Sequence, residues 1–210
     1  MNITNLFRDE TTTDLVKNRL PQLFQIAELE SSRAGKIGME VGSMRERILI
    51  ALLIHRFGDA NVETDIPITE PEVDVKVFGE PVSIKTITRS TLGGVKLAWT
   101  VDAQNALDFA RHYTPSCDML LAQINWNSLG YLYLFRQSQQ LDVMRTLGKQ
   151  GYMILPKAGT NPRGVEVSAK ALRMLASNVQ CPKIEIQWHR NEIDYDPYDR
   201  WLTLWRKQEL

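Results

Sequence analysis

The chain of 210 residues carries 25 basic and 25 acidic side chains, so its formal net charge is zero. That length suits one compact domain, residues 1–210, which would bury roughly 70% of the surface of the unfolded chain. The neutral balance excludes a polycationic protein, so any anion-binding surface must be a local patch. The longest apolar run, residues 48–54, is too short for a membrane span, and residues 1–8 lack a signal-peptide pattern, which predicts a cytoplasmic protein.

The first part of the chain predicts two helices, at residues 12–30 and 44–57, with a kink at Pro21 and a C-cap at Gly58. Three short segments with the β pattern follow, at residues 62–66, 73–78 and 81–88. Gly79 lies between the last two, which therefore predict neighbouring strands joined by a tight bend.

In the rest of the chain, segments with the helical spacing of apolar residues alternate with segments that have the two-residue spacing of strands. Strands are predicted at residues 95–99, 117–126, 130–135 and 183–189, and helices at residues 101–113, 138–148 and 168–178, with a serine cap for the helix at 138–148. The apolar strands at 117–126 and 130–135 are expected at the centre of the sheet. The predicted fold class is α/β, a mixed central β-sheet flanked by helices on both sides.

Several common sites are not indicated by the sequence. No GxGxxG, GxxxxGK[ST] or GxSxG motif occurs, so a dinucleotide site, a P-loop and a serine-hydrolase elbow are not predicted. The three histidines follow no metal or triad spacing; they are His55, His112 and His189. Cys117 and Cys181 lack a CxxC motif or a nearby histidine, which predicts reduced, partly buried thiols.

A cluster of carboxylates and a lysine is the strongest chemical signal. Asp74 lies in the segment EVDVKVFG, and Ser83 and Lys85 share one face of the next segment, EPVSIKTIT, because side chains alternate along a strand. If these strands pair across Gly79, Asp74 and Lys85 meet on one sheet face. Glu46, from the second helix, can add a second carboxylate from above.

Two carboxylates around an oxygen-preferring cation suit hydrolysis of a phosphodiester, with Mg²⁺ as the cofactor held by Asp74 and Glu46. Lys85 would orient or activate the attacking water. Each residue taken singly has a structural explanation: Glu46 at the start of a helix, Asp74 capping a strand, Lys85 solvated. Their joint placement favours a catalytic role for Glu46, Asp74 and Lys85.

A second arrangement uses the literal string DVK. Glu72, Asp74 and Lys76 would then form the site from a single strand. Ligands along one line converge less well on a cation than ligands from two strands and a helix, so we rank this arrangement second. Lys76 is expected to point toward solvent or a phosphate instead.

The order helix glutamate, strand aspartate and next-strand lysine resembles the PD-(D/E)XK nuclease superfamily, with Ser83 in place of the usual second acidic residue. Asp74 follows Glu46 by 28 residues (74 − 46), and Lys85 follows Asp74 by 11 (85 − 74). The spacing is similar to that of the ThaI family of type II restriction endonucleases, which cut CGCG between its central C and G. The resemblance covers residues 39–85. Without an acid at position 83, more of the metal binding falls to Glu46.

The same resemblance implies that Met39 intercalates into DNA, since it precedes Glu46 by 7 residues (46 − 39). In a helix that extends back to Met39, seven residues are about two turns and roughly 10 Å, so Met39 and Glu46 would share a face. A methionine can slide between stacked bases from the minor groove. Gly35, Gly38 and Gly42 would allow close approach of the backbone to the duplex. The alternative is that Met39 packs against a neighbouring helix or subunit.

Base reading must come from other residues. The segment LPKAGTNPRGVEV, residues 155–167, is rich in Gly and Pro and exposes Lys157, Asn161 and Arg163. Arginine or lysine opposite guanine O6 and N7 is the commonest specific contact in the major groove. Three further basic residues are candidates for phosphate contacts: Lys36, Arg89 and Lys96. A solvated charged surface is the plain alternative for both groups.

We therefore predict a homodimeric, Mg²⁺-dependent type II restriction endonuclease that cuts double-stranded DNA at a short palindrome, CGCG with a blunt cut. Two identical strand cuts follow most simply from two-fold symmetry. The resemblance also implies a cognate DNA methyltransferase that protects host DNA. Two alternatives stay open: a repair or junction-resolving nuclease of the same superfamily, and a non-catalytic DNA-binding domain.

Overall fold

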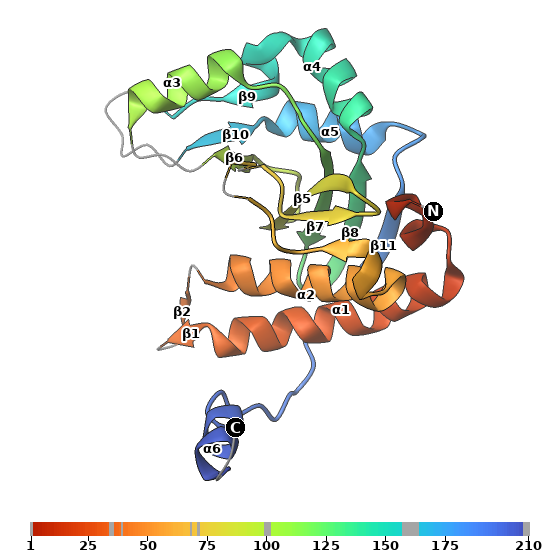
Figure 1. Ribbon diagram of the computed structural model, residues 1–210, viewed down its shortest axis with the longest axis vertical. Helices are drawn as coiled ribbons and strands as arrows, with labels where there is room; N and C mark the ends of the chain where they lie inside the picture. Colours follow the sequence, from red (N-terminus) through yellow and green to blue (C-terminus); the bar gives the residue numbers. More distant parts are fainter. Residues whose placement is uncertain are drawn as a thin grey trace.

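The computed structural model describes residues 2–33, 36–38, 40–67, 69–70, 72–98, 102–156 and 164–207, apart from the side chain of Arg33. A mixed sheet of six strands lies at its centre (Figure 1), in the order β11-β8-β7-β5-β4-β3. The strands are β3 (Val62–Glu63), β4 (Val75–Val77), β5 (Glu80–Thr88), β7 (Asp118–Ile124), β8 (Ser128–Phe135) and β11 (Lys183–Trp188).

β5 and β7 pair in parallel, and the other neighbours pair antiparallel. β7 and β8 are apolar and almost wholly buried, as expected for the strands at the centre of the sheet. β3, β4 and β5 form the predicted meander, and the bend between β4 and β5 uses Gly79 at φ 79°, a conformation that side chains with a Cβ rarely adopt.

Helices cover both faces of the sheet, which confirms the predicted fold class (Figure 1). α1 (Glu10–Glu30) and α2 (Val41–Phe57) lie on one face. α4 (Gln137–Tyr152) and α5 (Ala169–Ser177) lie on the other, with α3 (Ala103–His112) beside them. The buried apolar side chains accordingly form two clusters, one on each side of the sheet.

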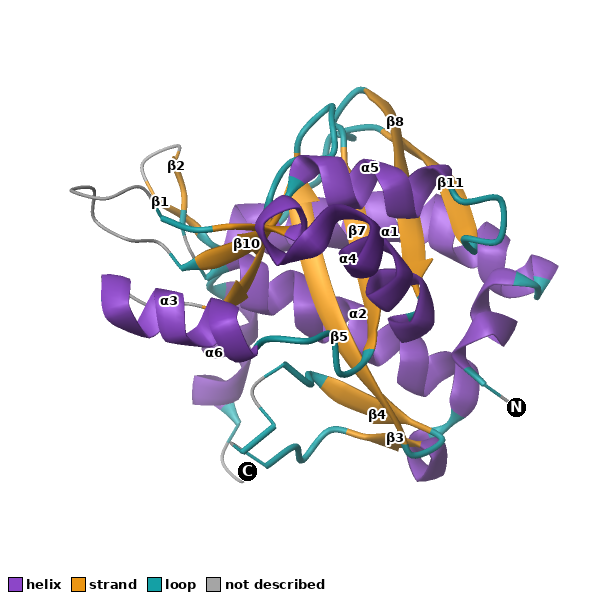
Figure 2. Ribbon diagram, turned by 90° about the horizontal axis from the view of Figure 1, so that it is seen from above, coloured by secondary structure: helices purple, strands orange, loops and turns teal. Residues whose placement is uncertain are grey.

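Small elements extend the domain on one side (Figures 1 and 2). β6 (Val95–Ala98) belongs to a separate three-stranded sheet with β10 (Val165–Val167) and β9 (Met153–Ile154), and the latter two strands were not predicted. A hairpin of β1 (Ser32–Arg33) and β2 (Lys36–Ile37) joins α1 to α2. The structure also has two short 3-10 helices, η1 (Ile3–Phe7) and η2 (Asp59–Asn61).

One helix prediction needs correction. α1 continues through Pro21 as the single helix that was predicted. The serine cap predicted for α4 is wrong, because the helix begins at Gln137 and Ser138 lies inside its first turn. The free N–H of Gln137 is instead bound by Asp118 Oδ1 at 2.7 Å, so β7 supplies the cap. α5 does have a serine cap that was not predicted from the sequence: Ser168 Oγ accepts the N–H of Ala171 at 3.0 Å.

The C-terminal helix α6 (Asp199–Arg206) lies apart from the sheet and buries none of its residues (Figure 1). Cys117 and Cys181 are free, buried thiols, as predicted, and burial raises the pKa of Cys117 to about 12. Among the described residues, no helix combines the length and apolar character that a membrane span requires.

Candidate active site

The candidate site lies where β4 separates from β5. The ladder between these strands ends at the Val75–Val82 pair, and the N–H of Asp74 makes one further bond to the carbonyl of Val82 at 3.0 Å. Beyond this point β5 has backbone donors that β4 no longer reaches. The carboxylate of Asp74 takes the place of the missing strand, because its Oδ2 accepts the N–H of Ile84 at 2.5 Å. The backbone therefore fixes the direction of Asp74.

Lys85 and Ser83 converge on the same oxygen from one face of β5. Lys85 Nζ lies 3.0 Å from Asp74 Oδ2, and Ser83 Oγ donates to it at 3.2 Å. The pair is partly buried, with side-chain exposures of 21% for Lys85 and 17% for Asp74, so water and substrate can still reach it. The predicted meeting of Asp74 and Lys85 on one sheet face is confirmed.

Glu46 lies in the second turn of α2, and it is partly buried. Burial raises the pKa of Glu46, the negative charge of Asp74 raises it further, and the positive charge of Lys85 acts in the opposite direction. The helix thus adds a second carboxylate close enough to interact electrostatically with both strand residues, as expected from the sequence.

The donor set fits a hard divalent cation. Two carboxylates that repel each other, beside one lysine, offer oxygen ligands of the kind that Mg²⁺ uses with water and phosphate completing its shell. Among the described residues, no group of three or more His, Cys, Asp or Glu side chains is arranged to hold a metal, so Asp74 and Glu46 are the two carboxylates that would hold one at this site. A cation between them would relieve the repulsion that raises the pKa of Glu46.

The alternative arrangement with Glu72 and Lys76 does not come together. Lys76 Nζ pairs with Glu70 Oε1 at 2.9 Å. Glu72 accepts the hydroxyl of Tyr113 at 2.6 Å and the N–H of Ser116 at 3.2 Å. Glu72 also lines a cavity of about 830 Å³ beneath α3, which neither Glu46 nor Lys85 lines. Both residues thus serve other contacts.

The predicted DNA-contacting residues are only partly described. Met39, Lys157, Asn161 and Arg163 lie outside the described residues. The expectation that Met39 and Glu46 share a helix face requires a helix that extends back to Met39. The described part of α2 begins at Val41. The other three candidates are exposed. Lys36 lies on β2, Arg89 directly follows β5, and Lys96 lies on β6.

One contact between the elements that carry the site had no sequence signal. Arg45, next to Glu46 on α2, donates through Nη1 to Thr88 Oγ1 at 2.9 Å. Thr88 ends β5, the strand of Lys85. The two residues are 43 positions apart, and neither belongs to a motif.

A mixed sheet flanked by helices, with two carboxylates and a lysine where two strands separate, defines an α/β protein of the restriction-endonuclease-like fold. The chain matches the family model described as restriction endonuclease ThaI over residues 6–207, and therefore belongs to the ThaI restriction endonuclease family. It is also similar to a solved structure titled "Restriction endonuclease in complex with substrate DNA". That match has 52% identity and a TM-score of 0.91, and it covers 97% of this chain and 98% of the other.

A comparison with curated proteins finds no match. The family and the structural neighbour together confirm the predicted enzyme class, a type II restriction endonuclease acting on DNA. Of the three functions left open by the sequence, they favour the first.

Proposed function

We propose that the protein is an Mg²⁺-dependent, homodimeric endonuclease that hydrolyses phosphodiester bonds of double-stranded DNA at the palindrome CGCG, leaving blunt ends. The observation that carries the proposal is the convergence of Lys85 and Ser83 on Asp74 Oδ2. Glu46 is close enough for the charges of Asp74 and Lys85 to affect its pKa. The likeness to a restriction endonuclease solved with its substrate DNA supports DNA as the substrate.

In this proposal, Asp74 and Glu46 hold the cation. When bound, Mg²⁺ supplies Lewis-acid polarisation of a phosphate oxygen. Lys85 orients the attacking water through its Nζ, which carries donors beyond the one directed at Asp74. Ser83, 1% exposed, holds Asp74 in place and does not itself contribute a charge. The uncommon serine is therefore compatible with hydrolysis, because Glu46 supplies the second carboxylate.

The duplex would lie on the side of the molecule that carries the hairpin of β1 and β2, the first turns of α2 and the sheet of β6, β9 and β10 (Figures 1 and 2). Lys36, Arg89 and Lys96 are exposed and would contact phosphates there. The segment between β9 and β10 contains the residues that we assign to guanine edges, Lys157, Asn161 and Arg163.

Met39 precedes Val41, the first residue of α2, by two positions (41 − 39) and is assigned to intercalation. An apolar wedge entering from the minor groove unstacks one base step at a cost of a few kcal/mol. A pyrimidine–purine step such as CG would be the easier one to open, if it shares the flexibility of TA and CA/TG steps. A two-fold dimer would place one such wedge and one active site on each half of the palindrome. A cognate DNA methyltransferase would protect the host.

The test is digestion of unmethylated plasmids that contain a known number of CGCG sites, with Mg²⁺ and with EDTA. Discrete fragments, only with Mg²⁺ and with blunt ends inside CGCG on sequencing, support the proposal. Discrete fragments with other ends would refute the assigned specificity. A smear, cutting confined to branched DNA, or intact plasmid under every divalent metal would refute the proposed activity.

A further inference from the structure

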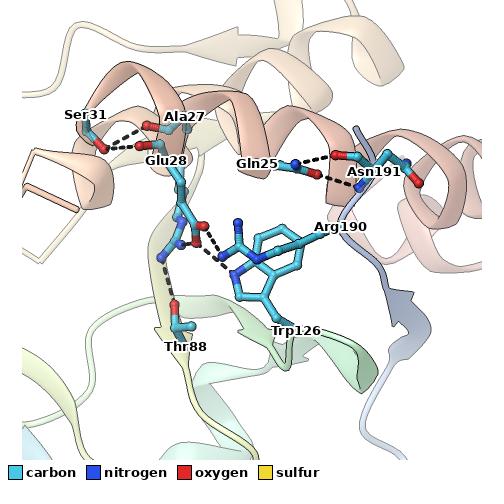
Figure 3. A network of polar contacts seen from close by, with 9 residues as sticks. Gln25, Ala27, Glu28, Ser31, Thr88, Trp126, Arg190 and Asn191 are labelled. Carbon is cyan, nitrogen blue, oxygen red and sulfur yellow. Dashed lines mark hydrogen bonds and ion pairs between the residues drawn. The ribbon is translucent and has the colours of Figure 1, made fainter. Parts of the chain in front are cut away.

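A buried charge network joins the two helices that cover one face of the sheet (Figure 3). Glu28, on α1, is 3% exposed and accepts hydrogen bonds from three partners, which are Arg45, Arg190 and the indole N–H of Trp126 at 2.9 Å. The guanidinium of Arg190 also stacks on the ring of Trp126, 4.3 Å from its centroid. Four separate segments thus meet at one carboxylate: α1, α2, the turn between β7 and β8, and the chain after β11.

Arg45 is the member of this network that also contacts β5. It is 5% exposed, lies over the ring of Phe24 at 5.6 Å, and donates to Glu28 with Nη2. Its other terminal nitrogen, Nη1, reaches Thr88 Oγ1 at 2.9 Å. A guanidinium can make both bonds at once because its donors point in fixed, separate directions. Arg45 therefore bridges α1, α2 and β5.

This bridge spans the two elements on which the proposed catalytic residues lie. Glu46 follows Arg45 directly on α2, and Lys85 precedes Thr88 by three residues on β5 (88 − 85). Successive side chains leave a helix about 100° apart, since one turn takes 3.6 residues. Fixing the direction of Arg45 consequently fixes the rotation of α2 about its axis, and with it the direction of the Glu46 carboxylate.

We propose that Arg45, held by Glu28 and anchored to Thr88, is a positioning residue that sets Glu46 against Asp74 and Lys85 for metal binding. The proposal rests on the function proposed above. The bond to Thr88 is the part of the network that reaches β5, the strand of Lys85. Glu28 pairs with the buried charge of Arg45, whereas Thr88 is exposed and accepts a hydrogen bond from its Nη1. The hydrogen bond to the Thr88 hydroxyl fixes the position of α2 relative to β5.

The test uses full-length protein with Thr88→Val, which keeps the shape of the side chain and removes the acceptor. We expect the Mg²⁺ concentration for half-maximal cleavage to rise about tenfold, as for the loss of one charge-assisted hydrogen bond. Cleavage at saturating Mg²⁺ and DNA affinity in EDTA should stay close to wild type, whereas Tm should fall because the buried Arg45 Nη1 loses its acceptor. Hydrogen exchange without metal should become faster in the first two turns of α2. Thr88→Ser, which keeps the hydroxyl, should restore wild-type values.

Two further variants separate positioning from stability. Arg45→Lys keeps the charge but cannot reach Glu28 and Thr88 together, so it should show the same shift in Mg²⁺ requirement. Arg190→Ala removes a partner of Glu28 on the side away from β5; it should lower Tm and leave the Mg²⁺ requirement unchanged.

Wild-type Mg²⁺ dependence and wild-type exchange of α2 in Thr88→Val would overturn the positioning role while leaving the proposed nuclease intact. An equal shift in Arg190→Ala would also overturn it, because general loosening of the network would then explain both. Absence of Mg²⁺-dependent cleavage in the wild type would count against the proposed function instead, and the exchange measurement would still decide whether Thr88 holds α2.

Discussion

Lys85 Nζ lies 3.0 Å from Asp74 Oδ2, at the point where the ladder between β4 and β5 ends. The distance is that of a charge-assisted hydrogen bond between partly exposed groups. Because Asp74 Oδ2 also accepts from Ile84 and Ser83, the carboxylate is fixed by three donors on one strand. In the function proposed above, its other oxygen, Oδ1, would bind the cation.

Asp74→Asn should lower the cleavage rate by about 10³-fold or more, because the loss of a carboxylate ligand removes several kcal/mol of charge stabilisation. DNA binding in EDTA should survive, since Asp74 is not assigned to a DNA contact. Single-turnover cleavage and a gel-shift titration measure the two effects. Cleavage within tenfold of wild type would place the catalytic carboxylate elsewhere.

Glu46→Gln should raise the Tm of the metal-free protein near neutral pH. The pKa of Glu46 is raised by burial and by Asp74, so the folded chain binds its proton more tightly than the unfolded chain. The ionised form therefore opposes folding, and this cost disappears as the pH falls through the folded pKa. Thermal melts should show the two proteins converging at acidic pH.

Added Mg²⁺ provides the control for Glu46. It should stabilise the wild type more than Glu46→Gln, because the variant has lost one of the two proposed ligands. A lower Tm for Glu46→Gln at neutral pH without metal would contradict the account of its environment.

Glu28→Ala should cost about 3–5 kcal/mol of unfolding free energy, because it leaves Arg45 buried without its carboxylate. The matched control is Asp14→Ala, which breaks an exposed pair with Lys17 at 3.9 Å and should cost less than about 1 kcal/mol. Chemical denaturation of both variants measures the difference. Equal losses would mean that the network around Glu28 contributes no more than a surface pair.

Met39→Ala should weaken binding to CGCG duplexes and leave binding to unrelated duplexes and the Tm unchanged. The reason is that an intercalating side chain acts only on a site that the protein has already recognised. Fluorescence anisotropy with both duplexes, together with a thermal melt, makes the measurement. A Tm lowered by several degrees with unchanged DNA affinity would instead assign Met39 to packing.

The sequence predicted the pairing of Asp74 with Lys85 because both residues lie on short strands joined at Gly79, and two-residue alternation fixes their faces. It ranked Lys85 above Lys76 and left Lys76 as the second choice, since Asp74 and Lys76 together spell the string DVK. Glu70 decides the matter by pairing with Lys76 at 2.9 Å, and Glu72 is held by Tyr113. Such contacts depend on loop conformation, for which a single sequence has no periodic signal.

The network around Glu28 was beyond prediction for a different reason. Its partners lie 17, 98 and 162 residues away along the chain, and each is an ordinary residue type in its own segment. Likewise, the cap of α4 by Asp118 replaces the local Ser138, because β7 and the start of the helix meet only in the folded chain. Local patterns predicted the elements, whereas these long-range polar contacts come from packing.

The central claim, that Lys85 and not Lys76 serves the site, is tested most directly by comparing Lys85→Ala with Lys76→Ala in single-turnover cleavage of a CGCG duplex at saturating Mg²⁺. The two lysines lie on neighbouring strands, and only Lys85 contacts Asp74. We expect Lys85→Ala to lose cleavage while still binding DNA, and Lys76→Ala to cut at close to the wild-type rate. Retained cleavage in Lys85→Ala with loss in Lys76→Ala would contradict the claim.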